Sequence, residues 1–272
     1  FFWGAQVLEL ARRAGAATVL TLHDYHPLCA QATLLDFRGQ LCEPRTVEDC
    51  ERCLAHLPTG AAAGGEVAPA GDAAATGVES SADRAREAQA TRVAFQRRAL
   101  GFAERVIAPS RTLAEAVLAA GFAAPERLLQ LDLGYPGRLH PPRVRPAHLP
   151  LRIGFVGGLL PAKGVHLLVA AMRLLDEEAL ELHLHGPLEW FENYVERLRL
   201  AAEGLRVHFH GRFAPDQVDE ILAGLDVLVL PSLWPENRPL VLTEARRNGL
   251  AIVATDLGGM REPHANAKHR AL

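Results

Sequence analysis

Apolar positions along the chain change repeatedly between helical spacing and short unbroken runs, which predicts alternating helices and strands. In the first half, apolar side chains recur at helical spacing in "AQVLELARRAGA", and the β-rich run "ATVLTLHD" follows directly. A long helix, a strand and a second helix closed by Gly121 come after residue 81. The elements predicted in this half are helix 5–16, strand 17–24, helix 82–103, strand 105–110 and helix 111–121.

The alternation restarts after Pro150. The strands of this second half are almost entirely apolar, as in "DVLVLPS", and such strands are typical of parallel sheets covered on both faces. The predicted strands are 151–157, 180–186, 206–211, 226–232 and 250–256, and the predicted helices are 163–175, 189–204, 215–225 and 239–249.

Two segments without any periodic pattern divide the chain. Residues 58–81 are rich in Ala and Gly and contain no aromatic residue, which predicts a flexible insertion. Residues 134–150 are dense in Pro and basic residues, which is typical of a linker. The predicted parts are an N-terminal α/β domain at 1–142 with the insertion at about 58–82, a linker at 143–150, and a C-terminal α/β domain at 151–272.

The composition excludes some classes of partner. The 272 residues carry a net charge of −3, so the basic footprint of a nucleic-acid-binding protein is missing. No apolar run is long enough to span a bilayer, and the first residues lack the pattern of a signal peptide. We therefore expect no nucleic-acid partner, and we expect any membrane association to be peripheral.

Two glutamates, Glu236 and Glu244, lie on either side of a predicted helix start. The preceding strand ends at Ser232, so Glu236 follows a carboxyl strand end, where parallel sheets bind their ligands. Pro239 suits the first turn of the helix, and the N–H groups after it can bind phosphate oxygens. Carboxylates beside that place suit the hydroxyls of a ribose or another sugar. The alternative is two solvated acids beside a helix start.

A second loop, "FVGGLLPAKGVHLL", runs from a strand into a helix with Lys163 and Gly164 at the turn. A lysine at a helix start can neutralise a diphosphate. The loop is not a Walker loop, because Lys precedes Gly, and the glycine spacing is not that of a dinucleotide loop. Taken alone, such a lysine is more often a solvated charge.

The motifs in combination are more specific. "FVGGLLPAKGV", "GLDVLVLPSLWPENRPLVLTEA" and "AIVATDLGGMRE" occur in this order, and they resemble the GT-B-fold, retaining glycosyltransferases of group 1 (family 4), which use nucleotide-sugar donors. "TLHDYHPLC" and "RVIAPSRTLAEAVLAAG" resemble the N-terminal half of that family. The resemblance covers most of residues 16–54 and 82–262. It implies an α/β fold class with two Rossmann-like parallel-sheet domains that face a cleft, both truncated in this chain.

The resemblance also implies roles for individual residues. Glu236 would contact the hydroxyls of the donor sugar, and Glu244 would hold the ribose of the nucleotide. Lys163 would neutralise the leaving diphosphate together with the N–H groups of Leu240 and Val241. No metal or other cofactor would be needed for catalysis.

The remaining donor-side residues are His23, Gly157, Gly158 and Pro239. His23, after an N-terminal strand, would reach the donor sugar; the alternative is a histidine bonded to a neighbouring loop. Gly157 and Gly158 form the glycine pair of the Lys163 loop, and Pro239 begins the helix. Gly158 departs from the family, which often has Arg there, so half of the expected diphosphate clamp is missing.

The implied function is retaining transfer of a hexosyl group from a nucleotide diphosphate sugar to a glycan, lipid or small-molecule acceptor. The implied location is the cytoplasm or the inner face of a membrane. The alternative is a non-catalytic nucleotide- or sugar-binding module, or an inactive fragment of a glycosyltransferase. Because the family has further elements before residue 5 and after residue 256, we expect weak donor binding and little transfer from this chain.

All four cysteines lie in one stretch, as C-x12-C-x7-C-x2-C: Cys29, Cys42, Cys50 and Cys53. Thiolates in this number suit a structural zinc ion, and reduced cysteines that only pack are the equal alternative. The stretch has no clear period and predicts an ordered loop.

Four histidines also stand in pairs along two predicted strands: His183, His185, His208 and His210. Side chains two apart in a strand share a face. Ordinary strand-end histidines are the stronger interpretation here, and a metal site the weaker one.

Overall fold

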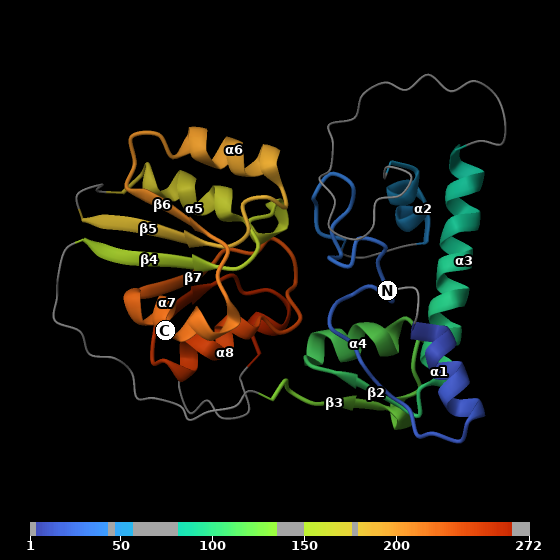
Figure 1. The fold of residues 1–272 in the computed structure, drawn as a ribbon. Coiled ribbons are helices and arrows are strands. Elements are labelled where there is room, and N and C mark those ends of the chain that lie inside the picture. Colours follow the sequence, from blue (N-terminus) through green and yellow to red (C-terminus); the bar gives the residue numbers. More distant parts are fainter. Residues whose placement is uncertain (1–3, 43–46, 57–80, 135–149, 176–178, 263–272) are drawn as a thin grey trace. The chain divides into compact units, whose positions relative to one another are not determined.

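The computed structural model describes residues 4–42, 47–56, 81–134, 150–175 and 179–262. They form two compact units, each with one parallel β-sheet (Figure 1). The N-terminal unit contains the described residues up to Leu133 and also two later pieces, Trp234–Arg238 and Glu262. The C-terminal unit contains the remaining described residues up to Arg261.

The sheet of the N-terminal unit has three parallel strands in the order β1-β2-β3. The strands are β1 (Val19–Thr21), β2 (Arg105–Ala108) and β3 (Leu128–Gln130). The helices are α1 (Gly4–Arg13), α2 (Val47–His56), α3 (Ser81–Phe102) and α4 (Arg111–Ala119). The central strand β2 and the helix α4 supply much of the core through Val106, Leu113 and Val117, which are fully buried.

The sheet of the C-terminal unit has five parallel strands in the order β6-β5-β4-β7-β8. The strands are β4 (Leu151–Val156), β5 (Leu180–His185), β6 (Val207–Gly211), β7 (Val227–Leu230) and β8 (Ala251–Ala254). The helices are α5 (Val165–Met172), α6 (Glu192–Ala201), α7 (Val218–Gly224) and α8 (Leu240–Arg247).

The hydrophobic core of this unit has two parts, one on each face of the sheet, because successive side chains of β4 point to opposite faces. Phe155 packs in one cluster with residues of α5 and α6, whereas its neighbour Val156 packs in another with residues of α7 and α8. Figure 1 shows the two helix pairs on opposite sides of the sheet. This double cover explains why the strands are apolar on both faces.

The structure confirms most elements that the sequence predicts and corrects two. The stretch that holds the cysteines is not wholly a loop, because helix α2 contains Cys50 and Cys53. The short strand β3 lies in a segment for which the sequence predicted no element. The predicted insertion at about 58–82 lies almost entirely outside the described residues, and so does most of the linker at 143–150.

Within the part of the chain that the structure describes, no helix combines the length and the apolar character that a bilayer-spanning segment requires.

A substitution at Gly164 can measure how tightly the loops pack at the carboxyl ends of the C-terminal strands. Its φ is +69°, and a Cβ atom at this position would lie 2.0 Å from the Pro231 carbonyl oxygen. Gly204 has a similar φ of +78° with nothing within 4 Å of its Cβ position. Both alanine variants incur the left-handed backbone cost of about 1–2 kcal/mol. We expect Gly164→Ala to lose about 1–3 kcal/mol more, because a backbone oxygen must move.

The free energy of unfolding in urea measures this difference. If Gly164→Ala and Gly204→Ala lower the free energy of unfolding equally, the backbone at Pro231 can move aside at no measurable cost, and the prediction is wrong.

Candidate functional site

The switch point in the strand order of the C-terminal unit lies between β4 and β7, where sheets of this kind form a ligand-binding crevice. Strands β5 and β6 follow β4 toward one edge of the sheet, and β7 and β8 lie between β4 and the other edge. Loops that leave two such strands go to opposite faces of the sheet, so ligands bind between them at the carboxyl ends. The loop after β4 carries Lys163, and the loop after β7 leads to α8.

The two loops at this switch point are tied together. The Leu233 N–H donates a hydrogen bond to the Ala162 carbonyl at 2.8 Å, next to Lys163. A 3-10 turn at Pro161–Lys163 ends at Gly164, which packs against the backbone of Pro231 and begins α5. Half-buried Lys163 is therefore held at the carboxyl ends of both strands.

The two glycines at the start of the Lys163 loop, Gly157 and Gly158, are closely packed against surrounding residues. Gly157 has a φ of +152°, and its carbonyl oxygen would meet a Cβ at Gly186, the residue after β5, at 1.9 Å. A Cβ at Gly158 would lie 3.1 Å from Leu160 and 3.5 Å from the Trp190 ring. The space that an arginine would use at position 158 is thus bordered by an aromatic ring.

Helix α8 begins beside this crevice without a side-chain cap. Pro239 is the residue before the helix, with φ −62° and ψ 120°, so it stands one position earlier than the first turn. The Leu242 N–H already donates to the Pro239 carbonyl at 3.1 Å. The first two N–H groups, of Leu240 and Val241, have no acceptor within a helix. Glu244 follows in the second turn and is half-buried.

Segment Trp234–Arg238 lies at the carboxyl edge of the sheet in the N-terminal unit. The side-chain amide of Asn237 donates to the carbonyls of Leu22 and His23, at 3.3 and 3.0 Å, just after β1. Its oxygen accepts a hydrogen bond from the Ser110 hydroxyl, just after β2, at 2.7 Å. The same hydroxyl accepts from the Leu113 N–H and caps α4.

Arg238 makes a corresponding contact with a residue after the third strand, β3. Its guanidinium makes a two-point ion pair with Asp132, just after β3, and its side chain is only 3% exposed. The segment therefore contacts residues that follow every strand of this three-stranded sheet.

Glu236 is held by the same segment and is 5% exposed. The Trp234 indole N–H donates to one Glu236 carboxylate oxygen at 3.0 Å. The Trp234 ring in turn meets the buried ring of Tyr25 edge to face, with 6.4 Å between the centroids. The carboxylate is thus oriented by an aromatic pair. His23 follows β1 on the same unit, with an exposed side chain.

The structure groups the predicted donor-side residues in two sets. His23 and Glu236 belong to the N-terminal unit, and the others to the C-terminal unit: Gly157, Gly158, Lys163, Pro239, Leu240, Val241 and Glu244.

Sequence reasoning missed the residues that position Glu236: Ser110, Asp132, Trp234, Asn237 and Arg238. It also missed Glu262, whose carboxylate accepts from the Arg111 and Thr112 N–H groups at 2.8 and 2.7 Å and caps α4 a second time. Only Ser110, in front of a predicted helix, carried a local signal, that of an N-cap.

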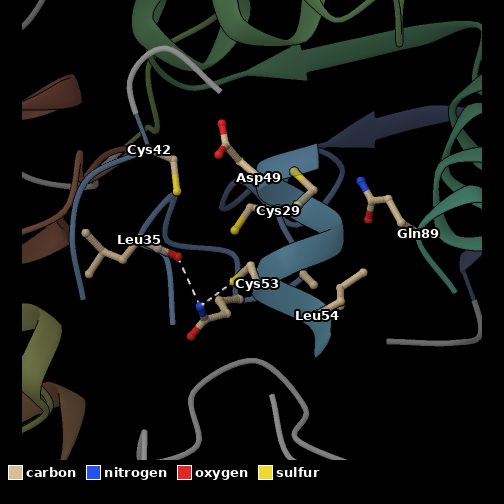
Figure 2. Close-up of a pocket in the computed structure, with 10 residues that line it drawn as sticks. Cys29, Leu35, Cys42, Asp49, Cys53, Leu54 and Gln89 are labelled. Carbon is tan, nitrogen blue, oxygen red and sulfur yellow. Dashed lines mark hydrogen bonds between the residues drawn. The ribbon is translucent and has the colours of Figure 1, made fainter. Parts of the chain in front are cut away.

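All four cysteines line one pocket of the N-terminal unit (Figure 2). Cys50 and Cys53 come from α2, and Cys29 and Cys42 from the segment after β1. None is in a disulfide, and the Gln31 amide donates to the Cys53 sulfur at 3.4 Å. Burial raises the pKa of Cys42 to about 12 and also raises the pKa of Cys53. Among the described residues, no three of these sulfurs lie within 4.8 Å of one another.

Comparisons with known proteins show a family similarity over the C-terminal part of the chain. Residues 150–271 match the family model described as glycosyl transferases group 1. The chain is 28% identical over 168 residues to the sulfoquinovosyl transferase SQD2 of Arabidopsis thaliana, over 58% of the chain and 32% of that protein. It is 33% identical over 116 residues to the putative glycosyltransferase YtcC of Bacillus subtilis, over 40% of the chain and 28% of that protein. The matches span about a third of each curated relative.

Among solved structures, Anabaena HepE in complex with UDP is similar over 94% of the chain and 58% of its own, with a TM-score of 0.61 and 19% identity. This likeness confirms the predicted fold class, two Rossmann-like parallel-sheet domains of the GT-B type. The family match over residues 150–271 and the two relatives support a group 1 glycosyltransferase.

The pair of Arg238 and Asp132 yields a prediction about how the Glu236 segment is held. We expect Arg238→Met to destabilise the chain by about 3 kcal/mol, because it leaves the Asp132 carboxylate without its main buried partner. The double variant Arg238→Met, Asp132→Leu should lose less than the single one, since it removes both charges. Urea unfolding of the two variants measures this. A double variant that loses as much stability as the single one, or more, would contradict the prediction.

Proposed function

We propose that this chain binds a nucleoside diphosphate sugar and transfers its sugar to an acceptor with retention of configuration. The proposal rests chiefly on the tie between the Lys163 loop and the loop that leads to α8 at the switch point of the C-terminal sheet. That arrangement presents a lysine and an uncapped helix N-terminus at one crevice, which suits a diphosphate.

The nucleotide end of the donor is assigned to Glu244. It lies in the second turn of α8, and a carboxylate accepts two hydrogen bonds from neighbouring hydroxyls, as a ribose presents them. Anabaena HepE has been solved with UDP and with UDP-glucose, which supports a uridine nucleotide as the first donor to test.

The leaving group is stabilised by charge in this mechanism. As the bond from the sugar to the diphosphate breaks, negative charge collects on the diphosphate oxygens. The Lys163 ammonium and the N–H groups of Leu240 and Val241 would neutralise it without a metal ion. Gly158 supplies no second cation, so we expect the clamp to depend more heavily on Lys163.

The sugar end of the donor is assigned to Glu236 and His23. The Trp234 indole N–H orients the Glu236 carboxylate, and a carboxylate can accept hydrogen bonds from sugar hydroxyls. The acceptor, retention and a cytoplasmic location stay predictions. The alternative function is a binding module that holds the same donor and transfers nothing; turnover separates the two.

Two glutamate variants test the assignment. We expect Glu244→Ala to weaken UDP binding tenfold or more, which corresponds to about 1.5–3 kcal/mol for a lost charged hydrogen bond. Glu236→Gln should leave UDP binding unchanged and lower turnover of the UDP-sugar. Glu220→Ala, on the exposed side of α7, is the matched control for both measurements.

Calorimetry with UDP and release of UDP from the sugar donor give the two readouts. Unchanged affinity in Glu244→Ala would refute the ribose assignment. Donor binding without either hydrolysis or transfer would favour the binding module.

We further propose that the cysteine pocket holds a structural zinc ion. Its support is that all four thiols of the chain line one pocket although they come from separate segments. Tetrahedral zinc, with Zn–S bonds of about 2.3 Å, would have to draw the sulfurs closer together. It would also replace protons that burial now holds on Cys42 and Cys53.

Metal analysis of the chain purified without added zinc tests this proposal. We expect about one equivalent, and Cys53→Ser should lose it together with thermal stability, because the metal links α2 to the loops. A metal-free chain with four titratable thiols would instead support packing cysteines.

A further inference from the structure

One face of strands β5 and β6 carries a cluster of imidazole rings. Leu182 and Leu184 of β5 pack into the core with α5 and α6. Because side chains alternate along a strand, His183 and His185 lie on the opposite face, together with Glu181. Among the described residues, neither hydrophobic cluster of the C-terminal unit contains a side chain from this face of β5 or β6.

A break in the register brings a third ring to the pair. His183 lies beside His208 in the ladder, whereas His185 lies beside Gly211, with a register shift after Leu184. His210 is therefore the extra residue on β6, and Gly211 after it has a φ of +79°. The bulge places the His210 ring against both histidines of β5.

The three rings lie close enough together to bind one ion. His183 Nδ1 lies 2.9 Å from His210 Nε2, and the rings of His185 and His210 stack with 4.1 Å between their centroids. One ligand nitrogen from each of the three rings lies within 4.8 Å of the others. Two nitrogens bound to one metal at about 2.1 Å are separated by about 3 Å, so the first pair already has the required spacing.

We propose that His183, His185 and His210 bind one divalent transition-metal ion, of the nickel or zinc class. Neutral imidazoles suit these ions, whereas magnesium and calcium require oxygen ligands. Three side chains leave coordination positions for water on the exposed side, where His210 lies. This site is independent of the proposed glycosyl transfer.

Glu181 supports the choice of nitrogen on His183. Its Oε1 lies 3.2 Å from His183 Nε2, and its Oε2 accepts from Arg206 at 3.1 Å. Within the described part of the chain, His183 Nε2 is buried without a hydrogen bond, and the charge of the nearby carboxylate favours a proton on it, which leaves Nδ1 to bind the metal.

A second set on the same face is less suited to a cation. Glu181, His183 and His208 also offer ligand atoms within 4.8 Å of one another. However, the carboxylate oxygen that faces His208, at 4.0 Å, already binds the Arg206 guanidinium. A metal there would displace or repel that charge, which favours the set with His185 and His210.

A metal in the proposed site would join the edge of the sheet to its neighbour. Strand β6 is an edge strand, and the three ligands come from β5 and β6. A ligand that binds only the folded state stabilises it by mass action. Nickel should therefore raise the melting temperature of the chain.

Nickel titration by calorimetry, using the full chain, tests the assignment. We expect His185→Gln and His210→Gln each to weaken nickel binding tenfold or more and to abolish the rise in melting temperature. His208→Gln is the matched control, since its ring stacks on His183 but lies outside the ligand set. Glu181→Gln should weaken binding by about tenfold, as a partner of a ligating histidine does.

Every variant keeps the cysteine pocket, so differences among them report this site alone. Loss of binding in His208→Gln with retention in His210→Gln would move the metal to the second set and overturn the proposal. Equal nickel affinity in all variants, or no binding in the parent chain, would show that the rings only pack against one another. Melting temperatures without metal confirm that each variant is folded.

Discussion

The hydrogen bonds of Asn237 and the ion pair of Arg238 fix the segment on which the rest of the proposed site depends. Polar groups after β1, β2 and β3 need partners when they are buried, and these two side chains supply them. Glu236 is consequently held at the carboxyl edge of that sheet. Pro239, the next residue along the chain, is the N-cap of α8 and belongs to the C-terminal unit.

Parallel sheets explain why the chemistry gathers in loops. All strand pairs in both sheets are parallel, so the carboxyl ends of a sheet share one edge. In the C-terminal unit, the strand order reverses between β4 and β7, and the loops after these two strands carry Lys163 and lead to the start of α8. The proposed reaction then needs positioned charge rather than a protein nucleophile, and Gly158 limits that charge to one lysine on its loop.

The two proposed metal sites place different demands on the fold. The thiols lie in a pocket where burial keeps Cys42 protonated, and a metal must both deprotonate the sulfurs and draw them together. The imidazoles of β5 and β6 are already at ligand spacing, because a bulge in the sheet sets it. One site would require rearrangement of loops, whereas the other is built into the hydrogen-bonded ladder.

From the sequence by itself, the α/β class and nearly every helix and strand could be predicted. The motifs around Lys163 and Glu244 could also be recognised as a candidate site. Hydrophobic period and glycine or proline placement are local properties, so they can be recognised without a fold. Helix α2 is amphipathic, but it occupies only 10 residues of a cysteine-bearing stretch that otherwise has no period, and β3 has only 3 residues, too few to show one. Only the tertiary structure decided that Asn237 and Arg238 belong to the N-terminal unit, more than 100 positions from Ser110 and Asp132. It likewise decided that His210 meets His183, since a one-residue shift in register changes which side chains are neighbours and leaves no trace in the spacing of the residues.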